Sequence, residues 1–194
     1  MLTHKGTNTI KTERLILRRF EIQDAENMYK NWATDSEVTK FLAWKPHENV
    51  EFTKSLLEKW IEDYKQECVY IWAIEYKETN EVIGSISVVK QNESKYLCEI
   101  GYCISRKYWN LGIMTESLKA VINYLFSEIG FNRIVALHDT NNEASGKVMI
   151  KNDMIYEGTF RQAGLRENKF YDLAQYAIIK CDWEKMFVWS HKTE

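Results

Sequence analysis

The feature that most constrains the fold is a strand, a long helix and a second strand that follow one another between residues 96 and 138. The first run, YLCEIGYCIS, and the last, RIVALH, are typical of strands. The helix between them has an apolar stripe and is followed by Gly130, a common helix stop; the stripe comprises Leu118, Val121, Ile122, Leu125, Phe126 and Ile129. A strand–helix–strand connection implies a parallel pair with a right-handed crossover. We therefore predict a mixed sheet.

The rest of the chain predicts hairpins and further helices around this unit. RLILRRF (14–20) is expected to be the first strand, and VYIWAIEY and EVIGSISVV a hairpin. Apolar residues at helical spacing predict one helix through Ala25, Met28, Tyr29 and Trp32, and a second from about Asn49 with Leu56, Leu57, Trp60, Ile61 and Tyr64 on its buried side. A further helix is expected to begin around Asn142, followed by the strands MIYEGTF and FYDLAQYAIIKC. The predicted α/β order is β-α-α-β-β-β-α-β-α-β-β.

Composition restricts the class of protein. The chain has 194 residues, no internal repeat and no composition break, so we expect a single domain over 1–194. A net charge of −2 gives no reason to expect nucleic acid or a membrane as partner. No apolar run is long enough for a signal peptide or a membrane span, which favours a cytoplasmic protein. The four cysteines and four histidines lack ligand spacing, so we expect reduced thiols and no metal site.

The segment YWNLGIMTES, residues 108–117, joins the first strand of the crossover unit to its helix. Gly112 stands where the chain must turn, and the first backbone N–H groups of the following helix point beyond the strand end. A helix start of this kind binds phosphate well. The alternative is that Gly112 only closes a turn, because a single glycine is weaker evidence than a full glycine-rich motif. Neither GxxxxGK[ST] nor GxGxxG is present, which argues against an ordinary nucleotide-binding site.

Four segments in the expected order resemble the GNAT superfamily of acyl-CoA-dependent N-acetyltransferases, and most closely its ribosomal-protein N-terminal acetyltransferase group. The segments are TERLILRRF, EIGYCISRKYWNLGIMTES, DTNNEASGKVMIKNDMIYEGTFRQ and DLAQYAIIKCDW, and the resemblance covers about residues 12–183. It implies a single mixed sheet of about seven strands, splayed between its fourth and fifth strands and flanked by about four helices.

The resemblance also implies acetyl-CoA as co-substrate, without a metal. Backbone N–H groups between Asn110 and Thr115 would hold its pyrophosphate, and backbone groups of Cys103 and Ile104 would pair with its pantetheine arm. Asn142 would contact the arm, although it also suits an N-cap. The expected cofactor-binding residues are Cys103, Ile104, Trp109, Asn110, Leu111, Gly112, Ile113, Met114, Thr115, Asn142 and Ser145.

Acetyl transfer to an amine needs a base for the ammonium and an acid for the leaving thiolate. Met149 stands where many members of the superfamily have a tyrosine acid, so we assign that role to Ser145; the alternative is a serine on the helix surface. Glu99, in an apolar strand, is the expected base, with a raised pKa. The alternatives are a glutamate paired with a lysine on the sheet face, or Glu167 as the base.

Aromatic residues between the first two predicted helices suit an acceptor site or simple loop packing. The expected acceptor-binding residues are Trp32, Trp44, His47 and Glu167. We expect an N-acetyltransferase that acts on a protein N-terminal amine through a ternary complex, and homodimerisation by family analogy. The alternatives are acetylation of a polyamine, an aminoglycoside or another small amine, a non-catalytic acyl-CoA sensor, and a purely structural interaction domain.

Overall fold

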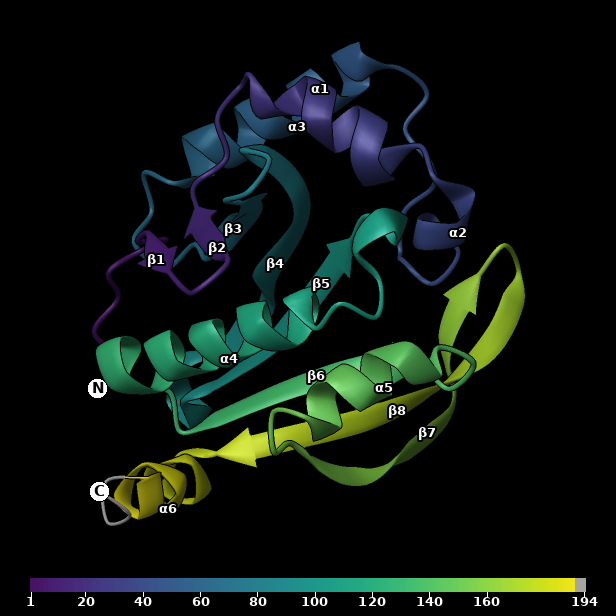
Figure 1. The fold of residues 1–194 in the computed structure, drawn as a ribbon. Helices are drawn as coiled ribbons and strands as arrows, with labels where there is room; N and C mark the ends of the chain where they lie inside the picture. Colours follow the sequence, from purple (N-terminus) through teal and green to yellow (C-terminus); the bar gives the residue numbers. More distant parts are fainter. Residues whose placement is uncertain (191–194) are drawn as a thin grey trace. The chain divides into compact units, whose positions relative to one another are not determined.

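The computed structural model describes residues 1–190, which contain eight β-strands and six α-helices (Figure 1). The chain divides into two compact units. The amino-terminal unit comprises His4–Val88 and Gly101–Val121, and the carboxy-terminal unit comprises Met1–Thr3, Val89–Ile100 and the residues from Ile122 onward. The predicted mixed α/β class is confirmed, with one strand and two helices more than expected. That these units form a single domain stays a prediction.

The amino-terminal unit contains an antiparallel run of strands in the order β1-β2-β3-β4. These strands are β1 (Ile10–Lys11), β2 (Leu15–Arg18), β3 (Ile71–Tyr76) and β4 (Glu81–Asn92), and the last extends into the carboxy-terminal unit. The predicted hairpin is confirmed as β3–β4, and Asn80 in its turn has φ +55°. The two-residue strand β1 was not predicted because it is too short to have a recognisable alternation.

The helices of this unit are α1 (Asp24–Met28), α2 (Ser36–Thr39) and α3 (Val50–Asp63). Helix α3 begins where it was predicted to begin, and Asn49 caps it by accepting a hydrogen bond from Phe52 N at 2.8 Å. Helix α1 continues as the π-helical turn η1 (Tyr29–Ala33), whose last three residues are buried. Ile61 was predicted to be buried on α3 but is 38% exposed, because it lies at the edge of the apolar stripe.

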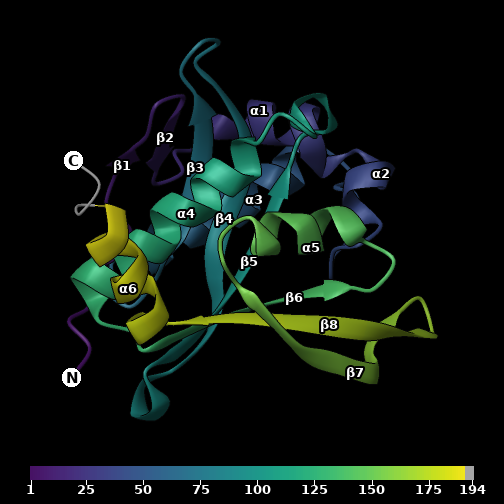
Figure 2. The same ribbon diagram turned by 60° about the horizontal axis from the view of Figure 1, so that its bottom comes forward.

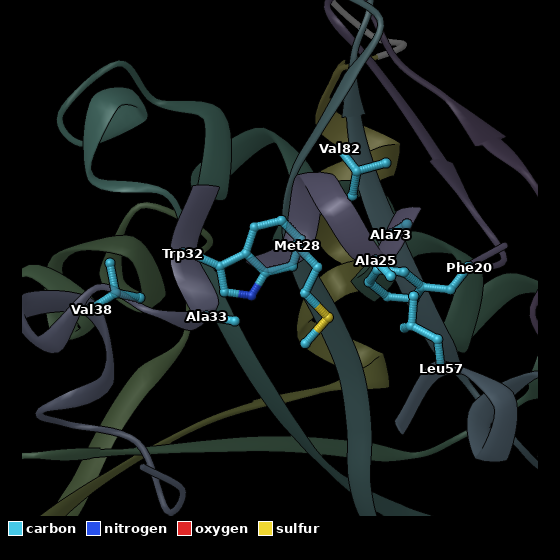
Figure 3. Close-up of a cluster of buried hydrophobic side chains, with 9 residues drawn as sticks. All are labelled: Phe20, Ala25, Met28, Trp32, Ala33, Val38, Leu57, Ala73 and Val82. Atoms are coloured by element: carbon cyan, nitrogen blue, oxygen red, sulfur yellow. The ribbon is translucent and has the colours of Figure 1, made fainter. Parts of the chain in front are cut away.

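The core of this unit is a cluster of buried apolar side chains from α1, η1, α2, α3, β3 and β4, together with one residue that follows β2. Its members are Phe20, Ala25, Met28, Trp32, Ala33, Val38, Leu57, Ala73 and Val82. Figure 3 shows the Trp32 ring beside Met28 within this cluster. Burial of such side chains contributes about 1.5–3 kcal/mol each, so the cluster accounts for much of the stability of this unit.

The carboxy-terminal unit contains the order β5-β6-β8-β7. Its strands are β5 (Leu97–Ile104), whose residues from Gly101 onward belong to the amino-terminal unit, β6 (Arg133–Asp139), β7 (Ile155–Arg166) and β8 (Lys169–Ile179). The predicted parallel pair is confirmed as β5–β6, with a register from Leu97↔Arg133 to Ile100↔Ala136. Both strands continue beyond that register, β5 to Ile104 and β6 to Asp139. The other neighbours, β6–β8 and β8–β7, are antiparallel.

Helix α4 (Ile113–Tyr124) ends in the π-helical turn η4 (Leu125–Ile129), and its predicted apolar stripe is buried. Gly130 follows with φ +88°, which confirms the predicted helix stop. Helix α5 (Glu143–Ile150) lies against β6 and β8 in both ribbon views (Figures 1 and 2). Helix α6 (Lys180–Ser190) was not predicted; Trp183 Nε1 ties it to Asn123 Oδ1 at 2.7 Å.

Candidate active site

The connection between β5 and α4 turns through two left-handed backbone positions. Asn110 has φ +62° and Gly112 has φ +75°. The first hydrogen bond of α4 runs from Glu116 N to Gly112 O at 3.0 Å, so the helix begins directly after Gly112. The N–H groups of Ile113 and Met114 consequently precede the first hydrogen bond of the helix and carry its partial positive charge.

The side chains of this connection divide between core and surface. Ile113 and Met114 are 1% and 6% exposed and anchor the start of α4. Leu111 and Trp109 are 54% and 39% exposed. Trp109 Nε1 donates a hydrogen bond to Ile104 O at 3.1 Å, so a pantetheine arm that paired with this carbonyl would share it with the indole.

The other predicted pantetheine contact, Cys103, packs closely against β4. Its Sγ lies 3.3 Å from Ser85 Oγ, and burial raises the pKa of the thiol. A Cβ placed on Gly84 would lie 2.5 Å from Cys103 O, so β4 must have glycine there for β5 to approach.

An ion pair that the sequence interpretation missed holds the start of α4. Glu116 Oε1 accepts hydrogen bonds from Thr12 Oγ1 at 2.5 Å and from Arg14 N at 3.0 Å, and Oε2 accepts from Arg14 Nε at 2.7 Å. Arg14 Nη1 also donates to Leu111 O at 2.9 Å. Burial by itself would raise the pKa of Glu116, but these hydrogen bonds and the Arg14 charge lower it. The signal in the sequence was an acidic residue in the first turn of the helix.

Glu99, the predicted base, lies on β5 opposite Val135 of β6. Its Oε2 is 3.4 Å from Lys90 Nζ, and the two side chains are 21% and 76% exposed. The lysine pairing that the sequence left open is therefore present. Because the lysine is mostly in solvent, the ion pair is weak, and part of the Glu99 side chain is itself accessible to solvent.

The predicted asparagine–serine segment begins α5. Asn142 is the N-cap, and its Oδ1 accepts a hydrogen bond from Ser145 N at 3.4 Å, so the capping alternative is confirmed. Met149, on the same helix, is 1% exposed. A Cβ placed on Gly146 would lie 2.8 Å from His138 Nε2 on β6, which makes α5 and β6 a close-packed pair.

Two of the predicted acceptor residues lie inside the amino-terminal unit. Trp32 is 0% exposed, so the prediction that it lines an acceptor surface does not hold in this structure; it lies in the buried cluster with Ala25 and Met28, from which it is separated by helical spacing. His47 is also buried, with Nδ1 2.8 Å from Thr53 Oγ1 and its ring between Trp44 and Phe52, and burial lowers its pKa. Trp44 is half-buried and remains partly on the surface.

Glu167 lies at the exposed tip of the β7–β8 hairpin. Glu167 and Asn168 have φ +48° and +62°, the two left-handed positions of a tight hairpin turn. Next to it, Arg166 stacks on Tyr171 with 4.4 Å from Cζ to the ring centre and donates to Asp139 at 3.3 Å. These contacts fix the base of the tip and leave Glu167 in solvent.

Residues 1–190 contain neither a metal-binding cluster nor a membrane-spanning helix. Within this part of the chain, no group of three or more His, Cys, Asp or Glu side chains is placed to hold a metal ion. Among the same residues, no helix is both long enough and apolar enough to cross a membrane.

Comparison with known proteins identifies the fold and the chemistry. The family model described as an acetyltransferase (GNAT) domain matches residues 14–155. YoaA of Bacillus subtilis, named an uncharacterised N-acetyltransferase, is 33% identical over 88% of this chain and 96% of its own. The Escherichia coli [ribosomal protein uS5]-alanine N-acetyltransferase is 25% identical over 90% and 92%. The crystal structure of a GNAT-family acetyltransferase from Bacillus anthracis aligns with a TM-score of 0.79, 29% identity and coverage of 89% and 99%.

Proposed function

Because this chain belongs to the GNAT family of acetyl-CoA-dependent N-acetyltransferases, we propose that its acceptor is the N-terminal amine of a protein. The observation that supports this acceptor class is the similarity to the uS5-alanine N-acetyltransferase, which extends over 90% of the chain rather than over the cofactor motif alone. A shared domain of this length includes the segments that precede and follow the cofactor loop.

The proposed cofactor site uses the backbone of residues 110–115. Pyrophosphate would accept hydrogen bonds from the N–H groups that the start of α4 leaves without helical partners. The left-handed conformations of Asn110 and Gly112 support this assignment, since turns that contain left-handed residues form anion-binding nests of successive N–H groups. By the family resemblance, Asn142 and Ser145 of α5 would complete the contacts with the pantetheine arm.

For the chemical step, the amine nitrogen attacks the thioester carbon, and collapse of the tetrahedral intermediate breaks the C–S bond. We assign Glu99 as the base that takes the ammonium proton, directly or through water, and Ser145 as the group that protonates the thiolate. The exposed position of Lys90 supports the first assignment, because a solvent-exposed lysine can leave the carboxylate at little cost. Met149 is buried and has no hydroxyl, so it supplies no proton.

For the acceptor, we retain Trp44 and Glu167 as contacts and exclude Trp32. Trp44 is half-buried and Glu167 is exposed on a hairpin tip, so both have surface that a peptide can reach. His47 supports the Trp44 loop from inside, with ring contacts to Trp44 and Phe52 at 5.1 and 4.9 Å.

The test is a release assay for free CoA thiol with a panel of amine acceptors. Short peptides with Ala, Ser or Met at the N-terminus are compared with the same peptides carrying a blocked N-terminus, and with a polyamine and an aminoglycoside. Thiol release with the free peptides alone is the expected result. Release only with the small amines would contradict the proposed acceptor class, and tight acetyl-CoA binding without turnover of any acceptor would identify a sensor.

A further inference from the structure

The segment proposed to hold pyrophosphate contains no Lys or Arg between residues 108 and 115. Arg106, just before it, forms an ion pair with Asp35 at 3.0 Å. A different cation lies beside the turn: a Cβ placed on Gly112 would be 3.6 Å from Arg14 Nη2. Arg14 comes from just before β2, about a hundred residues earlier in the chain. The negative charge of a phosphate at this turn would therefore be neutralised by a cation from another part of the chain, namely Arg14.

The Arg14 guanidinium is held in one orientation. Its Nε donates to Glu116 Oε2 at 2.7 Å and its Nη1 to Leu111 O at 2.9 Å. Neither contact uses Nη2, and the side chain is 37% exposed. A planar guanidinium fixed through two of its nitrogens presents the third with little loss of side-chain entropy. The nitrogen so presented is the one nearest Gly112.

The position of Glu116 supports the same conclusion. A carboxylate in the first turn of a helix can bond to the free N–H groups or repel an incoming anion. Here both carboxylate oxygens are occupied by Thr12 and Arg14, and the negative charge is neutralised by the ion pair. The start of α4 is consequently left available for an anion other than Glu116.

We propose that Arg14 Nη2 donates a hydrogen bond to a phosphate group of acetyl-CoA, and that Glu116 positions Arg14 for that contact. The inference rests on the proposed function, because it assumes that the turn at Gly112 binds the cofactor. The phosphate is either part of the pyrophosphate or the 3′-phosphate of the ribose. Both present the same oxyanion chemistry to a guanidinium.

The test is calorimetric titration of Arg14→Gln with CoA, dephospho-CoA and pantetheine. The matched control is Lys59→Gln, which removes one positive charge from an exposed position on α3. We expect Arg14→Gln to weaken CoA binding about tenfold, the scale of one charge-assisted hydrogen bond, and to leave pantetheine binding unchanged. The control should bind all three ligands like the wild type. A loss that persists with dephospho-CoA identifies the pyrophosphate, and a loss confined to CoA identifies the 3′-phosphate.

Wild-type affinity for CoA in Arg14→Gln would overturn the inference, as would equal losses for CoA and pantetheine. If Arg14→Gln does not fold, Arg14→Lys is measured instead. That variant should bind CoA more weakly than the wild type but bind pantetheine equally well, and parallel losses again overturn the inference. Failure of the wild type to bind CoA at all would instead overturn the proposed function.

Discussion

The turn between β5 and α4 and the hairpin of β7 and β8 are built in opposite ways. The turn is held by buried side chains at Ile113 and Met114 and by the ion pair of Arg14 with Glu116. The hairpin has two register shifts, between Tyr156 and Gly158 and between Phe160 and Gly164. It also exposes large apolar side chains, namely Ile155, Tyr156, Phe160, Leu165 and Phe170.

This difference matches the difference between the two proposed ligands. The cofactor is the same in every turnover, so a backbone fixed by side-chain contacts recognises it at little entropic cost. Acceptors differ between proteins of one fold, and exposed side chains on a hairpin can change without disturbing the core. The comparison predicts that substitutions in the turn act on cofactor binding and substitutions in the hairpin on the acceptor.

The largest expected effect is that of Gly112→Val. Gly112 has φ +75°, and a β-branched residue strongly resists that conformation. The nearest atom to an added Cβ is Arg14 Nη2 at 3.6 Å, so the backbone rather than a clash within the protein causes the effect. We expect the turn to change conformation and acetyl-CoA binding to fall below detection by calorimetry, while the protein stays folded.

Gly112→Asn is the matched control, because asparagine tolerates the left-handed region. If conformation is decisive, this variant keeps part of its affinity. If both variants lose binding equally, any side chain at position 112 blocks the approach of the phosphate. If a folded Gly112→Val protein binds acetyl-CoA with wild-type affinity, Gly112 only forms the turn and has no role in cofactor binding.

The next largest effect is expected for Glu99→Gln, which keeps the shape of the side chain and removes its basicity. A positioned base contributes about 10²–10⁴-fold, so we predict a kcat lower by about two orders of magnitude with acetyl-CoA affinity nearly unchanged. Lys90→Gln separates this role from the ion pair at 3.4 Å. If Glu99 only pairs with Lys90, the two variants should have the same kcat, and that result would eliminate Glu99 as the base.

A smaller effect, on stability, is expected for Glu116→Gln. The pKa of Glu116 is lowered in the folded state, so its contribution is present above the unfolded pKa of about 4.3 and is lost as pH falls through the folded value. At pH 7 we expect a loss of roughly 1–2 kcal/mol, or about 2–8 °C in Tm. The Tm difference between variant and wild type should shrink between pH 5 and pH 3. A difference that is constant with pH would contradict the assignment.

The smallest effect on stability is expected in the hairpin. Phe170 is 65% exposed, so Phe170→Ser should change the free energy of unfolding by no more than about 0.5 kcal/mol. If the tip contacts the acceptor, the KM for the acceptor should rise several-fold. Ile155→Ser, at the other end of β7 and 62% exposed, is the control and should change neither quantity. Equal KM values for the two variants would show that the hairpin tip does not contact the acceptor.

The sequence predicted those parts of the fold that depend on a single periodic pattern. The apolar stripe of α4, the helix starts near Asn49 and Asn142 and the parallel pairing of β5 with β6 follow from local pattern. Helix α6 was not predicted, because its start continues the strand pattern of β8 without a break. The burial of Trp32 agrees with its place at helical spacing from Ala25 and Met28, both also buried, and conflicts only with its assignment to the acceptor surface.

The candidate site was predictable in its backbone and not in its side-chain contacts. The left-handed turn at Asn110 and Gly112 follows from residue type, since asparagine and glycine tolerate positive φ. The bond from Arg14 to Leu111 joins residues 97 positions apart, a distance over which local pattern has no information. The sequence likewise left unnamed the lysine that would pair with Glu99. The structure identifies it as Lys90.

The close approach of α5 to β6 couples two positions by volume. Gly146 packs so closely against His138 that even a methyl group at position 146 would clash, since its Cβ would lie 2.8 Å from the imidazole. A chain with alanine at 146 therefore requires that the His138 ring shift, that residue 138 be smaller than histidine, or that α5 move outward and carry Ser145 with it. Substitution of both residues together should therefore destabilise the protein less than the two single substitutions would suggest. In a double-mutant cycle of Gly146→Ala and His138→Ala, the paired change should be less damaging than the sum of its parts.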